Sequence, residues 1–111
     1  MNYHDKKFKV ANNSQNGEVD EEMVFHYRQE GKILSSDYSG ADIIKGHLIA
    51  LVDDNGIIEM RYHQMNKQGD LRTGRCKSRP EIMPNGKIKL HEEWEWLSGG
   101  EGKGTSTLIE I

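Results

Sequence analysis

The fold is decided by residues 42–65, which read DIIKGHLIALVDDNGIIEMRYHQM. Segments 42–52 and 57–65 each alternate between two sides, which is typical of β-strands with one buried face. Between them, Asp54-Asn55-Gly56 has the composition of a three-residue turn, because its glycine accepts a positive φ. Such a turn puts the even positions of both strands on the inner side: Ile44, Gly46, Leu48, Ala50 and Val52, then Ile58, Met60, Tyr62 and Gln64.

The same alternation continues on both sides of this hairpin. In 21–30 the inner side carries Met23, Phe25 and Tyr27, and in 87–97 it carries Ile88, Leu90, Glu92, Trp94 and Trp96. For segment 70–78 the sequence does not determine which side faces inward. Leu71 favours the odd positions, whereas Gly74 and Cys76 favour the even ones. Further turn signals are Asn16-Gly17, Glu30-Gly31, Ser39-Gly40, Asn66-Lys67-Gln68-Gly69 and Pro84-Asn85-Gly86. No segment has sustained helical periodicity, so we expect about eight or nine antiparallel strands and little or no helix.

Consecutive hairpins in an open sheet would leave exposed edges, and closure removes them. We therefore predict an all-β fold, a single antiparallel up-and-down β-barrel of the lipocalin-like or calycin-like kind, with a two-sheet sandwich as the alternative. The barrel spans 1–111 as one domain, with about 1–4 and 98–104 flexible. About eight strands make a barrel that is either filled by side chains or wide enough for one small ligand.

Composition excludes several classes of function. The chain has 111 residues, 15 basic and 18 acidic, with a net charge of −3, which indicates one domain and argues against non-specific nucleic-acid binding. No apolar run is long enough for a membrane helix, and the first residues lack the apolar part of a signal peptide. The single cysteine, Cys76, excludes an internal disulfide. We expect a cytoplasmic protein without nucleic-acid or membrane partners.

The expected inner face is aromatic and partly polar. An inward carboxylate such as that of Glu92 is costly unless it is hydrogen-bonded or neutralised. An aromatic wall with a few convergent polar groups is typical of a ligand pocket, so we predict a small, partly apolar ligand and no cofactor. A satisfied polar network in a filled barrel is the alternative. The candidate ligand-binding residues are Tyr27, Tyr38, Tyr62, Glu92, Trp94 and Trp96.

The outer face offers two further features. Its histidines come from different segments without ligand spacing, so we expect them to face solvent and to bind no metal: His26, His47, His63 and His91. The outer apolar residues Ile43, Ile49 and Leu51 could form a patch through which two copies associate. A non-catalytic, dimerising interaction module is therefore a second functional hypothesis.

Tyrosine and glycine recur at related positions. Tyr38 is followed by Gly46, and Tyr62 by Gly74, which suggests an internal repeat of about 24 residues. Two adjacent hairpins would produce the same pattern.

The chain resembles a group of small bacterial proteins of about this length. The resemblance covers residues 5–111 and is carried by FHYRQEG (25–31), DYSG (37–40), MRYH (60–63), PNGKIKLHE (84–92) and WEW (94–96). Members are often called N-acetylglutamate synthase or are uncharacterised, so the resemblance implies an acetyltransferase, in which Glu92 would be the general base. The residues themselves contain no acetyl-CoA-binding motif, and an all-β chain cannot supply the common acetyltransferase fold. We therefore expect a binding protein, with the synthase as the alternative.

Overall fold

The computed structural model describes residues 1–13 and 23–111, and within them it contains nine strands and no helix. Nor do these residues include a helix long and apolar enough to cross a membrane. The predicted turn at Asn16-Gly17 lies outside the described residues. The strands are β1 (Lys7–Asn13), β2 (Val24–His26), β3 (Arg28–Glu30), β4 (Ile33–Gly40), β5 (Ile43–Val52), β6 (Ile58–Asn66), β7 (Leu71–Ile82), β8 (Ile88–Ser98) and β9 (Lys103–Glu110).

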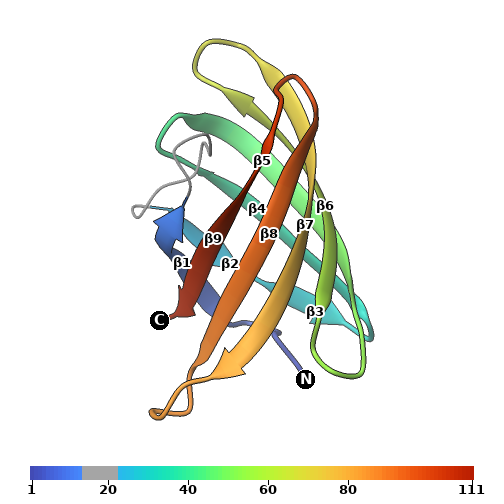
Figure 1. The fold of residues 1–111 in the computed structure, drawn as a ribbon, viewed down its shortest axis with the longest axis vertical. Helices are drawn as coiled ribbons and strands as arrows, with labels where there is room; N and C mark the ends of the chain where they lie inside the picture. Colours follow the sequence, from blue (N-terminus) through green and yellow to red (C-terminus); the bar gives the residue numbers. More distant parts are fainter. Residues whose placement is uncertain (14–22) are drawn as a thin grey trace.

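The strands form one antiparallel sheet in the order β2-β1-β9-β8-β7-β6-β5-β4-β3. Its two ends, β2 and β3, are halves of one stretch interrupted at Tyr27. The first half pairs with β1 and the second with β4. At the interruption, the Tyr27 N–H donates to the Lys6 carbonyl over 3.0 Å and the Asp5 N–H donates to the Tyr27 carbonyl over 2.9 Å. This stretch therefore closes the sheet into a barrel (Figure 1), which confirms the predicted fold class.

The turn between β5 and β6 has the predicted geometry. The Asp53 N–H donates to the Ile57 carbonyl and the Gly56 N–H to the Asp53 carbonyl, each over 3.0 Å. Gly56 has a φ of 81°, which a residue with a side chain adopts only at a cost. Val52 then pairs with Ile58, so the even positions from Gly46 to Val52 and from Ile58 to Gln64 face inward, as predicted.

One part of the predicted register is wrong. Ile43 pairs with Asn66 and Lys45 with Met65, so Ile44 is the extra residue of a β-bulge. Ile43 is consequently buried, with 2% of its surface exposed, whereas Ile44 is 57% exposed. Two adjacent isoleucines fit either face equally well, and a bulge reverses the alternation without a mark in the apolar pattern.

The structure shows which side of β7 faces the inside of the barrel. Gly74, Cys76 and Ser78 are buried, and Leu71 is 61% exposed. Gly74 pairs with Tyr62 of β6 and Cys76 pairs with Met60, so the inner face of β7 continues that of β6.

Tyr3 closes one end of the barrel. Although it belongs to the segment expected to be flexible, its side chain is fully buried, and its hydroxyl donates to the Gly56 carbonyl. Its N–H donates to Gln29 Oε1 over 2.9 Å. Its ring lies 6.3 Å from those of Phe8 and Tyr27, centroid to centroid. Tyr27 also lines the cavity described below, whereas Tyr3 and Phe8 do not.

Candidate functional site

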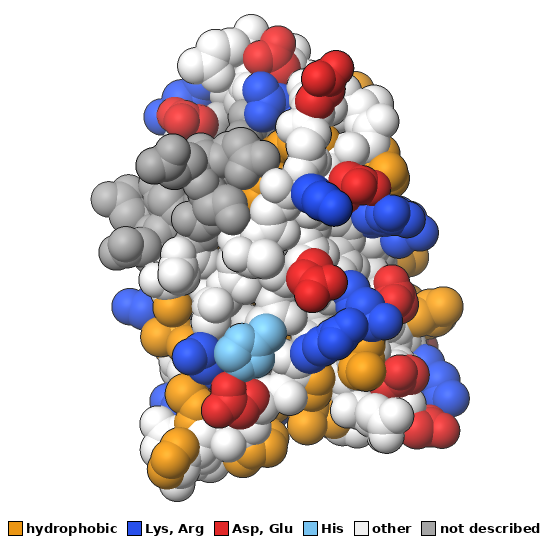
Figure 2. Space-filling view, in the orientation of Figure 1, with side chains coloured by type: hydrophobic (Ala, Val, Ile, Leu, Met, Phe, Trp, Pro, Cys, Tyr) orange, Lys and Arg blue, Asp and Glu red, His pale blue; other side chains and the backbone are white. Residues whose placement is uncertain are grey.

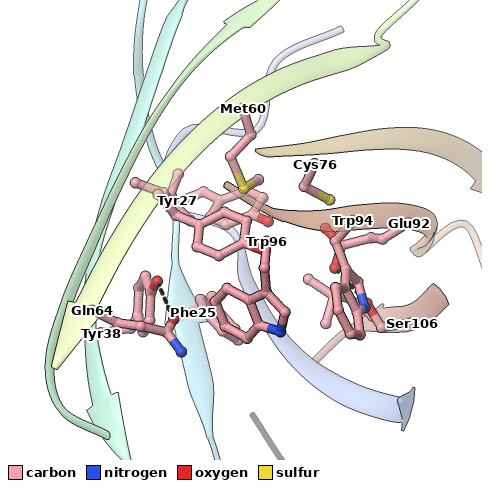
Figure 3. A pocket seen from close by; sticks show the side chains of 13 residues that line it. Phe25, Tyr27, Tyr38, Met60, Gln64, Cys76, Glu92, Trp94, Trp96 and Ser106 are labelled. Atoms are coloured by element: carbon pink, nitrogen blue, oxygen red, sulfur yellow. Dashed lines mark hydrogen bonds between the residues drawn. The ribbon is translucent and has the colours of Figure 1, made fainter. Parts of the chain in front are cut away.

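A cavity of about 60 Å³ lies inside the barrel (Figure 3). Its lining residues are Phe25, Tyr27, Tyr38, Leu48, Met60, Tyr62, Gln64, Cys76, Glu92, Trp94, Trp96, Ser106 and Leu108. They come from β2 and from β4 to β9, together with Tyr27, because the inner positions of these strands converge on one space. All six predicted site residues are among them: Tyr27, Tyr38, Tyr62, Glu92, Trp94 and Trp96.

The Glu92 carboxylate is hydrogen-bonded by both neighbouring strands. Ser78 of β7 donates to Oε2 over 2.7 Å, and Ser106 of β9 donates to Oε1 over 3.0 Å. Both serines are register partners of Glu92, so the three form a row across the sheet. Burial raises the pKa of the Glu92 carboxyl above its usual range, and hydrogen bonds from Ser78, Ser106 and Cys76 offset part of that effect.

Tyr27 brings a second polar group to the cavity. Its side chain is fully buried, and its hydroxyl has no hydrogen-bond partner among the described residues. Burial and, second, the charge of Glu92 raise the pKa of this hydroxyl well above its usual range. A buried hydroxyl without a partner costs about 1–3 kcal/mol of stability. The cavity therefore contains a hydrogen-bonding group that the surrounding described residues leave unused.

The Cys76 thiol lines the same cavity. Its Sγ lies 3.8 Å from Ser78 Oγ. Burial and the charge of Glu92 raise the pKa of the thiol well above its usual range. Since the thiolate is the reactive form, this buried thiol is a weak nucleophile.

Three aromatic rings form one wall of the cavity. The Trp96 ring lies 5.8 Å from the rings of both Tyr62 and Trp94, with interplanar angles of 71° and 60°. Across the cavity, the Tyr38 hydroxyl donates to Gln64 Oε1 over 2.8 Å. The wall thus combines a large apolar surface with few polar atoms, as in many small-molecule sites.

Two glycines make room for the tyrosine rings. Tyr38 pairs with Gly46 and Tyr62 with Gly74 across neighbouring strands. A Cβ atom at Gly46 would lie 2.3 Å from the Tyr38 ring, and one at Gly74 would lie 2.4 Å from the Tyr62 ring. The suggested internal repeat is therefore a pair of equivalent cross-strand Tyr–Gly contacts in two hairpins.

Sequence reasoning missed Arg72 at the rim of the barrel. Its guanidinium carbon lies 5.3 Å from the centroid of the Trp96 ring. A Cβ atom at Gly99 would come within 3.0 Å of Arg72 Cα and Cγ, and one at Gly100 within 3.3 Å of the Trp96 ring. The β8–β9 connection therefore packs closely on this cation–π pair. Sequence reasoning could not place Arg72 because it lies in segment 70–78, for which the sequence did not determine the inward-facing side.

The outer face carries mixed charges (Figure 2). Arg75 pairs with Glu95 over 3.0 Å and Lys77 with Glu59 over 3.6 Å. The predicted outer histidines lie on this side of the barrel: His26 beside Asp5, His91 beside Glu81, and His47 next to His63. Within residues 1–13 and 23–111, no three His, Cys, Asp or Glu side chains converge as a metal site would require.

The predicted outer apolar patch has a different membership. Ile43 is buried because of the bulge, whereas Ile49 and Leu51 are exposed. Ile33, which is also exposed, pairs with Leu51 on the neighbouring strand. The patch therefore consists of Ile33, Ile49 and Leu51, on the outer side of β4 and β5.

Comparison with known proteins overturns the resemblance to the N-acetylglutamate synthase group, which was wrong. The chain matches a family model described as avidin-like protein over residues 1–111. The motifs that suggested the synthase are strands and turns of the barrel: residues 25–31 include β2 and β3, and 94–96 belong to β8. Searches of curated proteins and of solved structures return no match. With a match along its whole length, the chain belongs to the avidin-like family.

Proposed function

We propose that the protein binds a small, partly apolar ligand inside the barrel and catalyses no reaction on it. The observation that carries the proposal is the unpartnered Tyr27 hydroxyl in the cavity that Glu92 also lines. A hydroxyl both donates and accepts hydrogen bonds, so a polar head group placed there would remove the cost of leaving it unpaired. Membership of the avidin-like family supports a binding barrel rather than an acetyltransferase.

The remaining lining residues suit the rest of such a ligand. Trp94, Trp96 and Tyr62 supply rigid apolar contact area at little entropic cost. Each Glu92 oxygen accepts one serine hydroxyl, which leaves room for a further donor on each. At about 60 Å³ the cavity is small, so the inserted group is compact.

The test is a titration of tryptophan fluorescence with a panel of biotin, octanoate and acetamide. We expect a saturable change with at least one member. Tyr27→Phe should weaken the affinity of that member about tenfold, which corresponds to one hydrogen bond of about 1.4 kcal/mol. The control is Glu93→Gln, whose side chain faces outward on β8 and should leave the affinity unchanged. The absence of a saturable response to any of these compounds, and to acetamidinium as well, would contradict the proposal.

The apolar patch of Ile33, Ile49 and Leu51 favours a second role, association of two copies. Three exposed branched side chains on adjacent strands form a contiguous apolar surface. Sedimentation of the protein and of Leu51→Lys over a range of concentrations tests this. A monomer at every concentration would rule the role out.

A further inference from the structure

We infer that the cavity selects a ligand whose head group is an organic cation with N–H donors, an amidinium, guanidinium or primary ammonium, held by Glu92. This inference rests on the proposed function and specifies the chemical class of its ligand. It depends on the charges around the cavity, on the aromatic rings beside Glu92 and on the position of Arg72.

The cavity is lined by one carboxyl group and, among the described residues, by no basic side chain. Glu92 is the only charged side chain among the described residues that line it. The groups that hydrogen-bond its carboxylate, the Ser78 and Ser106 hydroxyls and the Cys76 thiol, are all neutral. A carboxylate taken out of water is stabilised most by a cation that also donates hydrogen bonds. An N–H-bearing cation at Glu92 would supply both.

The aromatic wall favours the same class of ligand. The faces of aromatic rings attract cations, and Trp is the strongest. Trp94, Trp96 and Tyr62 are mutually inclined, so rings in different orientations bound the space next to Glu92. A neutral apolar group would use these rings equally well, but it would leave the carboxylate uncompensated.

Arg72 favours one orientation of such a ligand in the cavity. Its guanidinium lies over Trp96 at the rim, so a positive head group is disfavoured at the rim and favoured deeper, at Glu92. A cationic head would be bound inside, and the remainder of the ligand would extend past Arg72.

Acetamidinium and acetamide form a matched pair of probes. Both are planar and have the same number of non-hydrogen atoms, but only acetamidinium is charged. Titration of each, followed by the NMR signals of the Trp94 and Trp96 indole N–H groups, gives both affinities. We expect acetamidinium to bind at least tenfold more tightly than acetamide. Glu92→Gln should reduce this preference to less than twofold, and Glu93→Gln should leave it intact.

A pH series on the unmodified protein provides a measurement that does not depend on the variant folding. Acetamidinium stays charged at every pH of the series. Burial keeps the Cys76 thiol and the Tyr27 and Tyr62 hydroxyls protonated, so Glu92 is the acidic group whose titration changes the cavity. The preference should be lost as the pH falls and Glu92 takes up a proton.

Each outcome separates the inference from the proposed function. If acetamide binds as tightly as acetamidinium, or if the preference survives in Glu92→Gln, the cation inference is wrong and the binding function stands. If neither probe, nor biotin or octanoate, shifts the indole signals, both fail. A preference that disappears in Glu92→Gln and at low pH supports the inference.

Discussion

Tyr27 and Tyr38 line the same cavity, but their hydroxyl groups are in opposite situations. The Tyr38 hydroxyl donates to Gln64 over 2.8 Å, whereas the Tyr27 hydroxyl has no partner among the described residues. Replacement by phenylalanine removes the same atom in both cases, so the two positions allow a matched comparison.

We predict that Tyr27→Phe raises the free energy of unfolding by about 1 kcal/mol and that Tyr38→Phe lowers it by about the same amount. The first variant removes an unsatisfied buried group, and the second leaves Gln64 Oε1 without this donor. Urea unfolding of the ligand-free protein measures both. A loss of stability in Tyr27→Phe would show that its hydroxyl is paired in solution.

At this scale the sequence predicted much of the site. Alternation alone placed Tyr27, Glu92 and Trp94 on one inner face, because each lies in a segment whose apolar and polar residues alternate clearly. It did not identify Ser78 or Ser106 as the partners of Glu92. Those contacts depend on which residues face each other across β7, β8 and β9, and a single strand's pattern does not contain that information.

The β5–β6 hairpin shows the contribution of one turn residue. Asp53 Oδ1 accepts the N–H groups of Asn55 and Ile57 over 2.8 and 2.9 Å. The next residue, Asp54, forms an exposed ion pair with Lys32 over 3.3 Å.

Asp53→Ala should therefore lower the free energy of unfolding by about 1–2 kcal/mol, since two charge-assisted hydrogen bonds are lost. Asp54→Ala should change it by less than about 0.5 kcal/mol, as is usual for an exposed pair. Thermal unfolding of both variants compares them directly. Equal effects would mean that Asp53 does not organise the turn.

The position of the bulge in β5 could not be predicted from the sequence of that strand. Alternation and glycine-containing turns predicted the strands, but nothing in Ile43-Ile44 indicates which isoleucine is the extra residue. The pairing with β6 decides it, because Asn66 and Met65 are opposite Ile43 and Lys45. The location of a bulge is thus a property of two strands together.

This assignment predicts a sharp contrast between neighbouring residues. Ile43→Lys should prevent folding or cost more than about 4 kcal/mol, since it places a charge in the core. Ile44→Lys should change stability by less than about 0.5 kcal/mol, because that side chain faces solvent. Circular dichroism with thermal melting distinguishes the variants, and the reverse order would place the bulge elsewhere.

At the scale of the whole molecule, the barrel encloses three phenols that resist ionisation. Burial, with a smaller contribution from Asp53, raises the pKa of Tyr3 to about 12. Burial is also the main cause that raises the pKa of Tyr27 and of Tyr62. In the unfolded chain these groups titrate near pH 10.

Above pH 10 the unfolded chain therefore holds fewer protons than the folded barrel, so the free energy of unfolding should fall as the pH rises from 10 toward 12 and beyond. Well below pH 10 these hydroxyls are protonated in both the folded and the unfolded state, so they do not make the free energy of unfolding depend on pH. We expect phenolate absorbance at 295 nm from all three to appear together with the loss of circular dichroism. Their ionisation near pH 10 in a barrel that is still folded would contradict this.

The position of Tyr3 also determines how a bound molecule exchanges with solvent. Because this side chain blocks one end of the barrel, a molecule bound inside would have to enter and leave through the opposite end. With the binding function proposed above, such a barrel would store and release a molecule and would not pass one from end to end.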